Sequence, residues 1–89
     1  MLAKIKQALR ITHDALNDEI SDLIEAAKLD LSISGVQVID ETDPLIIRAI
    51  TLYSKANFGL SNEDSEKYLR GYTSLKIHLA LCGEYHVDV

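Results

Sequence analysis

Apolar residues recur at spacings of three and four along most of this chain, and this spacing limits the possible folds more than any other feature of the sequence. Side chains spaced in this way lie on one face of an α-helix. Only one proline and four glycines interrupt the 89 residues, so there are few points at which a helix must break. The sequence therefore predicts an all-α fold.

Four helices are expected, over about residues 1–10, 15–34, 44–58 and 62–82. The clearest start is Asp43 followed by Pro44, because an N-cap carboxylate accepts from free backbone N–H groups and proline suits the first helical position. Glycines favour the left-handed conformation that ends helices. The expected stops are Gly35, Gly59 and Gly83, and the other candidate caps are Asp14 or Asn17 for the second helix and Ser61 or Asn62 for the fourth.

These helices are expected to pack as one compact bundle. Its predicted core contains Leu9, Ile20, Leu23, Ile24, Ala27, Ile46, Ile50, Tyr53, Tyr72, Leu75 and Leu79. Apolar residues surround most of the helix over 44–58, which indicates a central helix covered by the others or by another subunit. Gly71 lies inside the last helix, where it indicates a close approach by another helix or a bend.

Two segments outside the helices have β character. Residues 36–39 are interpreted as an extended linker packed over the core. Residues 84–89 alternate polar and apolar side chains but have no evident strand partner in the chain. We therefore expect one helical domain over 1–83 and a C-terminal tail over 84–89 that is mobile in the monomer. On docking, this tail would bury Tyr85, Val87 and Val89 against a neighbouring subunit or another protein.

Composition excludes several classes of protein. The net charge of −5 argues against a nonspecific DNA-binding surface, because phosphate affinity needs unpaired Lys and Arg. No apolar stretch approaches the ~18 residues of a membrane span, and Lys4, Lys6 and Arg10 interrupt any signal peptide. The single cysteine forms no internal disulfide, which agrees with the reducing cytoplasm.

Two spacings suggest metal or acid chemistry, and in both cases a structural interpretation is preferred. His78, Cys82 and His86 recur every four residues, but Gly83 should end the helix before His86, so no metal is expected. Asp14, Asp18 and Asp22 also recur every four residues and are interpreted as a solvated helix face.

Catalytic signatures are missing from the sequence, so we expect neither an enzyme nor a cofactor. The last two helices carry basic and aromatic residues that could in principle contact nucleic acid. Neighbouring acids make this a mixed-sign surface, and ordinary helix salt pairs are preferred. The residues concerned are Lys55, Lys67, Arg70 and Lys76, with Tyr53, Tyr68 and Tyr72.

The order of four segments resembles the small helical head-tail connector proteins of phages and prophages of Gram-positive bacteria. The segments are Leu2-x-x-Ile5-Lys6-x-x-Leu9-Arg10-Ile11, Asn17-Asp18-Glu19-Ile20-x-x-Leu23-Ile24-Glu25-Ala26-Ala27, Asp43-Pro44-Leu45-Ile46-Ile47-Arg48-Ala49-Ile50 and Tyr53-x-x-x-Asn57-Phe58-Gly59. These are helix-packing patterns, and their order and spacing carry the resemblance over nearly the whole chain. The chain is shorter than larger relatives, and its C-terminal segment is abbreviated.

The resemblance implies a structural protein that forms a ring of about a dozen copies at the head-tail junction of the virion, after assembly in the host cytoplasm. Its implied partners are further copies of itself, the portal protein and the next tail-completion protein, while packaged DNA passes through without specific binding and no membrane is involved. The third helix would supply one subunit face. The candidate interface residues are Ile47, Arg48, Leu52, Lys55, Tyr85, Val87 and Val89.

The sequence leaves two other functions open. A small acidic helical bundle also suits a protein-binding module or regulator, such as an antitoxin-like protein. A metal-dependent or nucleotide-handling enzyme is the third hypothesis. Rings visible by electron microscopy would separate the connector from the binding module, and metal analysis of the purified protein would address the enzyme.

Overall fold

The computed structural model describes residues 1–58 and 64–87. Its elements are α1 (Leu2–Ala8), α2 (Asn17–Ile33), α3 (Pro44–Asn57), α4 (Ser65–Leu81) and a short 3₁₀ helix, η1 (Gly83–Tyr85). No strand occurs within these described ranges. The all-α fold with four main helices is therefore confirmed.

The start of α3 has the predicted chemistry. Asp43 is the N-cap, and its carboxylate accepts a hydrogen bond of 2.8 Å from the backbone N–H of Leu45. Pro44 occupies the first helical position, where its missing N–H leaves no hydrogen bond unmade. The Asp43–Pro44 prediction is confirmed.

The end of α2 is also as predicted. Gly35 has a φ of +105°, and the N–H of Val36 donates to the carbonyl of Leu31 at 3.0 Å. The N–H of Gly35 donates to the carbonyl of Ser32 at 3.1 Å. This pair of bonds is a Schellman motif, which needs a left-handed residue and therefore favours glycine.

The capping prediction for α2 is wrong. Its N-cap is Leu16, which supplies no side-chain hydrogen bond. Asp14 instead accepts from Lys6 Nζ at 2.8 Å and from Asn17 Nδ2 at 3.4 Å. The ion pair with Lys6 joins the loop to α1, and Asp14 supplies no cap hydrogen bond to α2.

The remaining helix limits differ from the predictions by a few residues. α1 ends at Ala8 because Arg10 takes a φ of 61° and Ile11 donates back to Lys6. α3 ends at Asn57, and α4 begins after its N-cap Asp64. The predicted stop at Gly59 and the predicted caps Ser61 and Asn62 lie outside the described residues.

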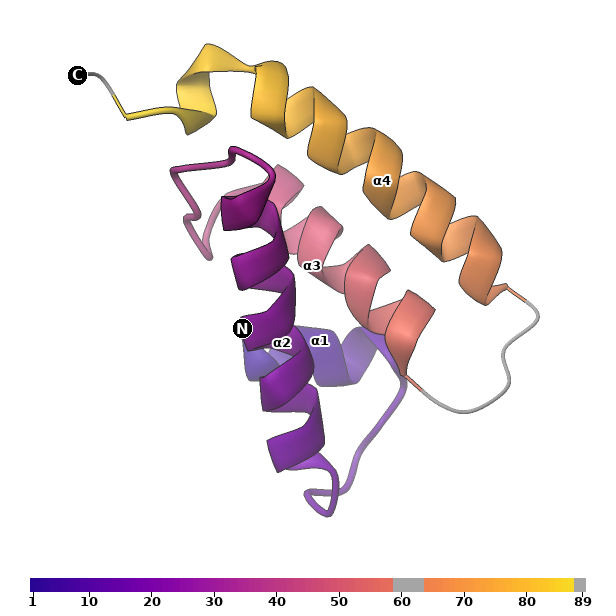
Figure 1. Cartoon of the computed structure of the whole chain (residues 1–89). Helices are drawn as coiled ribbons and strands as arrows, with labels where there is room; N and C mark the ends of the chain where they lie inside the picture. Colours follow the sequence, from indigo (N-terminus) through magenta and orange to yellow (C-terminus); the bar gives the residue numbers. More distant parts are fainter. Residues whose placement is uncertain (59–63, 88–89) are drawn as a thin grey trace.

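α3 and α4 lie side by side and run in opposite directions, while α2 crosses them and α1 lies behind α2 (Figure 1). The buried core joins all of these helices through Ile5, Ile20, Leu31, Ile50 and Leu79. Seven of the predicted core residues are buried, and Leu9, Leu23, Tyr53 and Leu75 are partly buried. The core prediction is therefore confirmed in outline, although it omits Ile5, Leu31, Val36, Ala49 and the C-terminal Tyr85.

Gly71 faces α3, as its position inside a helix suggests. A Cβ atom added at Gly71 would lie 3.7 Å from both Cδ atoms of Leu52. This is an ordinary van der Waals distance, so α3 approaches α4 closely at this point without excluding a methyl group.

The C-terminal segment differs most from expectation. The carbonyl of Tyr85 accepts from the backbone N–H groups of Gln37 and Val38 at 2.8 and 2.9 Å, and Val87 N–H donates to Gln37 Oε1 at 2.8 Å. The prediction that this segment finds no partner in its own chain is therefore wrong. Its partner is the linker over 36–39, which forms neither helix nor strand and packs on the core through Val36 and Ile39.

Candidate functional site

The residues predicted to form a subunit face on α3 differ in how far they are buried within the monomer. Leu52 is 8% exposed and lies against Gly71 of α4. Ile47 and Lys55 are half-buried, and Arg48 is exposed. α3 is the central helix because α2 and α4 cover its apolar sides, so most of its apolar surface is already used within the monomer.

The predicted interface residues of the tail are also divided. Tyr85 is 7% exposed, and its hydroxyl donates to Asp43 Oδ2 at 2.9 Å. Val87 is 57% exposed and stays available to a partner. Val89 lies outside the described residues. In this conformation the ring of Tyr85 belongs to the core of the monomer.

Large apolar side chains that the monomer leaves exposed lie mainly on α2 and α4. We call Leu69, Ile77 and Leu81 the outer stripe of α4, and they are 48%, 53% and 81% exposed. Near the end of α2, Leu29 and Ile33 are 61% and 76% exposed. Exposed apolar residues that gather on one surface are typical of a site that meets another protein.

The ends of α2 and α4 that carry these residues adjoin. A Cβ atom added at Gly35 would lie 3.9 Å from the Cβ of Ala80, and the C-terminal ends of both helices meet near η1 (Figure 1). Ile33 and Leu81 therefore belong to the same end of the molecule.

Sequence reasoning missed this surface, although a signal for it was available. Assigning Tyr68, Tyr72, Leu75 and Leu79 to the buried side of α4 leaves Leu69, Ile77 and Leu81 on the other side, at spacings of eight and four. A second apolar stripe on an already anchored helix indicates a contact that the monomer does not make.

A polar contact fixes α4 against α2 beside this surface. Asp30 accepts a hydrogen bond from the Tyr72 hydroxyl and another, of 3.1 Å, from Lys76 Nζ. These donors lower the pKa of Asp30, and burial together with the acceptor raises the pKa of Tyr72. Tyr72 also packs edge-on against Tyr53, with ring centroids 5.2 Å apart.

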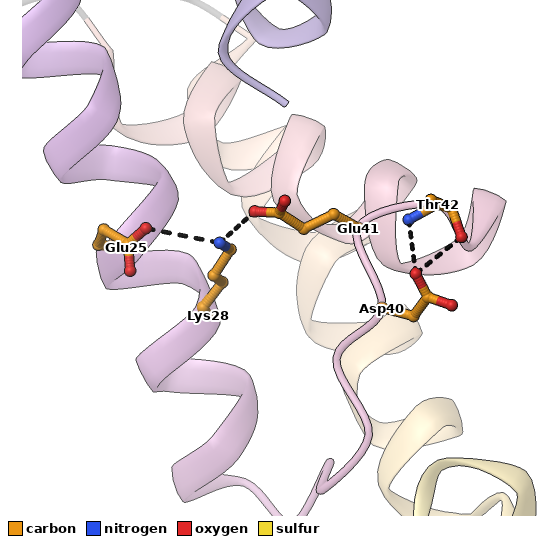
Figure 2. A network of polar contacts seen from close by, with 5 residues as sticks. All are labelled: Glu25, Lys28, Asp40, Glu41 and Thr42. Atoms are coloured by element: carbon orange, nitrogen blue, oxygen red, sulfur yellow. Dashed lines mark hydrogen bonds and ion pairs between the residues drawn. The ribbon is translucent and has the colours of Figure 1, made fainter.

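A second polar network joins α2 to the turn that precedes α3. Lys28 bridges Glu25 and Glu41, while Asp40 accepts from the N–H and hydroxyl of Thr42 at 2.8 and 2.7 Å (Figure 2). The bridge raises the pKa of Lys28 and lowers that of Glu41. Glu25 and Glu41 also border a hollow of about 180 Å³, and their shared lysine already satisfies them.

The candidate metal ligands do not converge. α4 ends at Leu81, which breaks the four-residue spacing, and His86 Nε2 lies 2.6 Å from the carbonyl oxygen of Ala80. Asp14 is paired with Lys6 before α2 begins, while Asp18 and Asp22 are exposed on that helix. Over residues 1–58 and 64–87, no three His, Cys, Asp or Glu side chains are grouped to hold a metal ion.

A larger hollow lies where the end of α1 meets the end of α3 and the start of α4. It has a volume of about 310 Å³ and is lined by Ala8, Leu9, Arg10, Lys55, Phe58 and Tyr68. Lys55 Nζ lies 5.3 Å from the centroid of the Tyr68 ring. We call this hollow the basic pocket.

The helices over residues 1–58 and 64–87 leave several large apolar side chains exposed. None of these helices is both long and apolar enough to span a bilayer.

A search of curated proteins and a search of solved structures each return no match. A family model described as phage connector protein matches residues 1–86. Since that match covers nearly the whole chain, the chain belongs to the phage connector protein family.

Proposed function

We propose that this connector protein is a structural ring component of the head-tail junction in a tailed phage or prophage. In this proposal it docks beneath the portal protein, offers a surface to the next tail-completion protein, and lets packaged DNA pass through without specific binding. Membership of the phage connector family over residues 1–86 supports the general role.

The exposed apolar surface on α2 and α4 is the structural observation that carries the ring. A ring is built from heterologous contacts, in which one face meets a different face of the next copy. Leu81 and Ile33 are among the most exposed large apolar residues in the described chain, at 81% and 76%. Removing such apolar surface from water favours association between copies.

We propose the main contact on helices other than α3, which is the helix that the sequence suggested. Leu52 of α3 is buried, whereas the outer stripe of α4 is open. We therefore place the apolar contact on α2 and α4, and keep the exposed Arg48 and Val87 as further candidates.

The acidic charge of the chain favours a ring that lets DNA pass and argues against a surface that binds DNA. The net charge is −5, and carboxylates repel the phosphate backbone. A ring lined by such surfaces would not hold the DNA that moves through it.

The test is ring formation by negative-stain microscopy, with the chain at high concentration and with its cognate portal protein. We expect rings from the unmodified chain, and loss of rings from Leu81→Ser and Ile33→Ser variants that keep their helical circular dichroism.

Leu45→Ser is the matched control, because Leu45 is exposed at 42% on α3 and lies outside the proposed contact. Rings that persist in Leu81→Ser and Ile33→Ser but disappear in Leu45→Ser would place the contact elsewhere. A discrete one-to-one complex without rings would instead favour the small acidic binding module.

A further inference from the structure

We propose that the basic pocket binds the acidic first turns of α2 from a second copy of this chain, which would make it a subunit contact of the ring. This inference rests on the proposed function and deepens it by naming one pair of contacting surfaces. The acidic surface consists of Asp18, Glu19 and Asp22, all exposed on α2.

The pocket contains two cations without a carboxylate partner in the described chain. The ion pairs found over residues 1–58 and 64–87 involve Lys6, Lys28 and Lys76. Arg10 and Lys55 join none of them, although both line the pocket. Because both cations line the same pocket, a carboxylate placed in it would be attracted by both of them.

The walls of the pocket suit an acidic side chain carried on a helix. Phe58 and Tyr68 supply aromatic surface, and Lys55 is held over the Tyr68 ring at 5.3 Å. The volume of about 310 Å³ accommodates one or two side chains. Carboxylates with their methylene groups would therefore meet both cations and apolar walls.

Arg10 is held in an unfavourable backbone conformation at this site. Its φ is 61°, in the left-handed region that glycine adopts more readily. The position ends α1 in a Schellman motif, with Arg10 N–H donating to Gln7 and Ile11 N–H donating to Lys6. Glycine would suit this turn better, so the backbone turn does not explain why position 10 is an arginine.

The same chain carries the complementary surface in an unpaired state. Within the described residues, Asp18, Glu19 and Asp22 take part in none of the ion pairs. The pocket lies at the junction of α1, α3 and α4, whereas these acids lie on the first turns of α2. Since the two surfaces do not meet within one molecule, their pairing requires another copy. Such a contact is heterologous and can repeat around a ring.

A charge exchange between two variants tests this contact directly. The first variant carries Arg10→Glu and Lys55→Glu, and the second carries Asp18→Lys and Asp22→Lys. Each variant alone should lose self-association, with an association constant at least about tenfold below that of the unmodified chain. Mixed in equal amounts, they should associate again, because each reversed surface then meets a complementary one.

Weak contacts are detected by nuclear magnetic resonance. With the second variant isotopically labelled, unlabelled first variant at about 1 mM should shift the amide signals of Ala8, Leu9 and Tyr68. These shifts should fade as salt is added, because salt screens exposed charges. The control is an unlabelled first variant that also carries Asp18→Lys and Asp22→Lys. No shift with the first variant at that concentration, or equal shifts with this control, would overturn the proposal.

Arg10→Gly separates this role from a structural one. It removes the cation and relieves the left-handed backbone, so the melting temperature should be unchanged or higher while association falls. A lower melting temperature with normal association would show that Arg10 serves the fold alone.

If the unmodified chain forms rings with the portal protein and the charge variants do so equally well, the pocket contact is wrong and the proposed function stands. If the unmodified chain forms no rings although the mixed variants associate at the pocket, the proposed function fails independently.

Discussion

The hydroxyl of Tyr85 donates to Asp43 Oδ2 at 2.9 Å, while Oδ1 of the same carboxylate accepts from the N–H of Leu45 at 2.8 Å. One side chain therefore caps α3 and anchors the C-terminal segment. The two residues are 42 positions apart in the sequence. This contact makes Tyr85 part of the folded domain and links the end of the chain to the start of its central helix.

Removing the Tyr85 hydroxyl should destabilise the protein. Tyr85→Phe keeps the buried ring but loses a hydrogen bond to a charged acceptor, so we expect the free energy of unfolding to fall by about 1–3 kcal/mol. Urea denaturation followed by circular dichroism measures this change. Tyr53→Phe is the control, since the contact shown for Tyr53 is its ring packing on Tyr72. Equal losses in both variants would contradict the role assigned to the hydroxyl.

Stability should also fall at high pH through the same residue. Burial and the hydrogen bond to Asp43 raise the pKa of Tyr85 from 10.0 to about 12. A pKa that is higher in the folded state stabilises the fold fully below pH 10, and that contribution is lost as pH rises from 10 to about 12. Denaturation curves over this range should show a shallower decline in Tyr85→Phe than in the unmodified chain. The pKa of Tyr72 is raised as well, so part of the decline should persist in the variant.

The C-terminal segment also shows where sequence reasoning stops. The helices follow from local spacing, and Asp43–Pro44 and Gly35 follow from chemistry within a few residues. The partners of Tyr85 and Val87 are Asp43, Gln37 and Val38, which lie 42 to 50 positions away. An alternating hexapeptide carries no information about such a distant partner. The sequence pattern therefore predicts a partner in another subunit, whereas the segment is bound by the linker of its own chain.

The candidate interface illustrates the same limit from the opposite direction. Apolar residues surround α3 in the sequence, and the pattern alone does not distinguish coverage by α2 and α4 from coverage by another subunit. Leu52 resolves this choice for its own position because it packs against Gly71. For Leu81 and Ile77 the outcome is the reverse, since α4 is packed through its other side and both residues are exposed.

Two glycine substitutions should have opposite effects. Gly71→Ala should stabilise the protein by about 0.4–1 kcal/mol, because the added methyl group meets Leu52 at 3.7 Å and alanine restricts the unfolded chain. Gly35→Ala should cost about 1–2 kcal/mol, because Gly35 has a φ of +105°. Thermal and urea denaturation of both variants provide the comparison. Destabilisation by Gly71→Ala would mean that α3 and α4 are closer than described, and a neutral Gly35→Ala would contradict the left-handed turn.

The last prediction concerns Asp30, which joins α2 to α4 through Tyr72 and Lys76. Their hydrogen bonds lower the pKa of Asp30 below its usual 3.8, so its contribution is present above that pH and is lost as pH falls through the lower folded value. Asp30→Asn keeps the size of the side chain but removes the charge that attracts Lys76. We expect the free energy of unfolding to fall by about 1 kcal/mol at neutral pH, because the site is partly exposed.

The measurement is the free energy of unfolding in urea from pH 7 down to pH 3. The difference between the unmodified chain and Asp30→Asn should shrink towards the acid end. Asp22→Asn removes the same charge from an exposed position of α2 beyond its first turn, without an ion pair in the described chain, so it should leave both the neutral value and the acid slope nearly unchanged. A constant difference between Asp30→Asn and the unmodified chain at every pH would show that the charge of Asp30 is not the cause of the loss, and the polar link between α2 and α4 would then contribute no charge interaction to the fold.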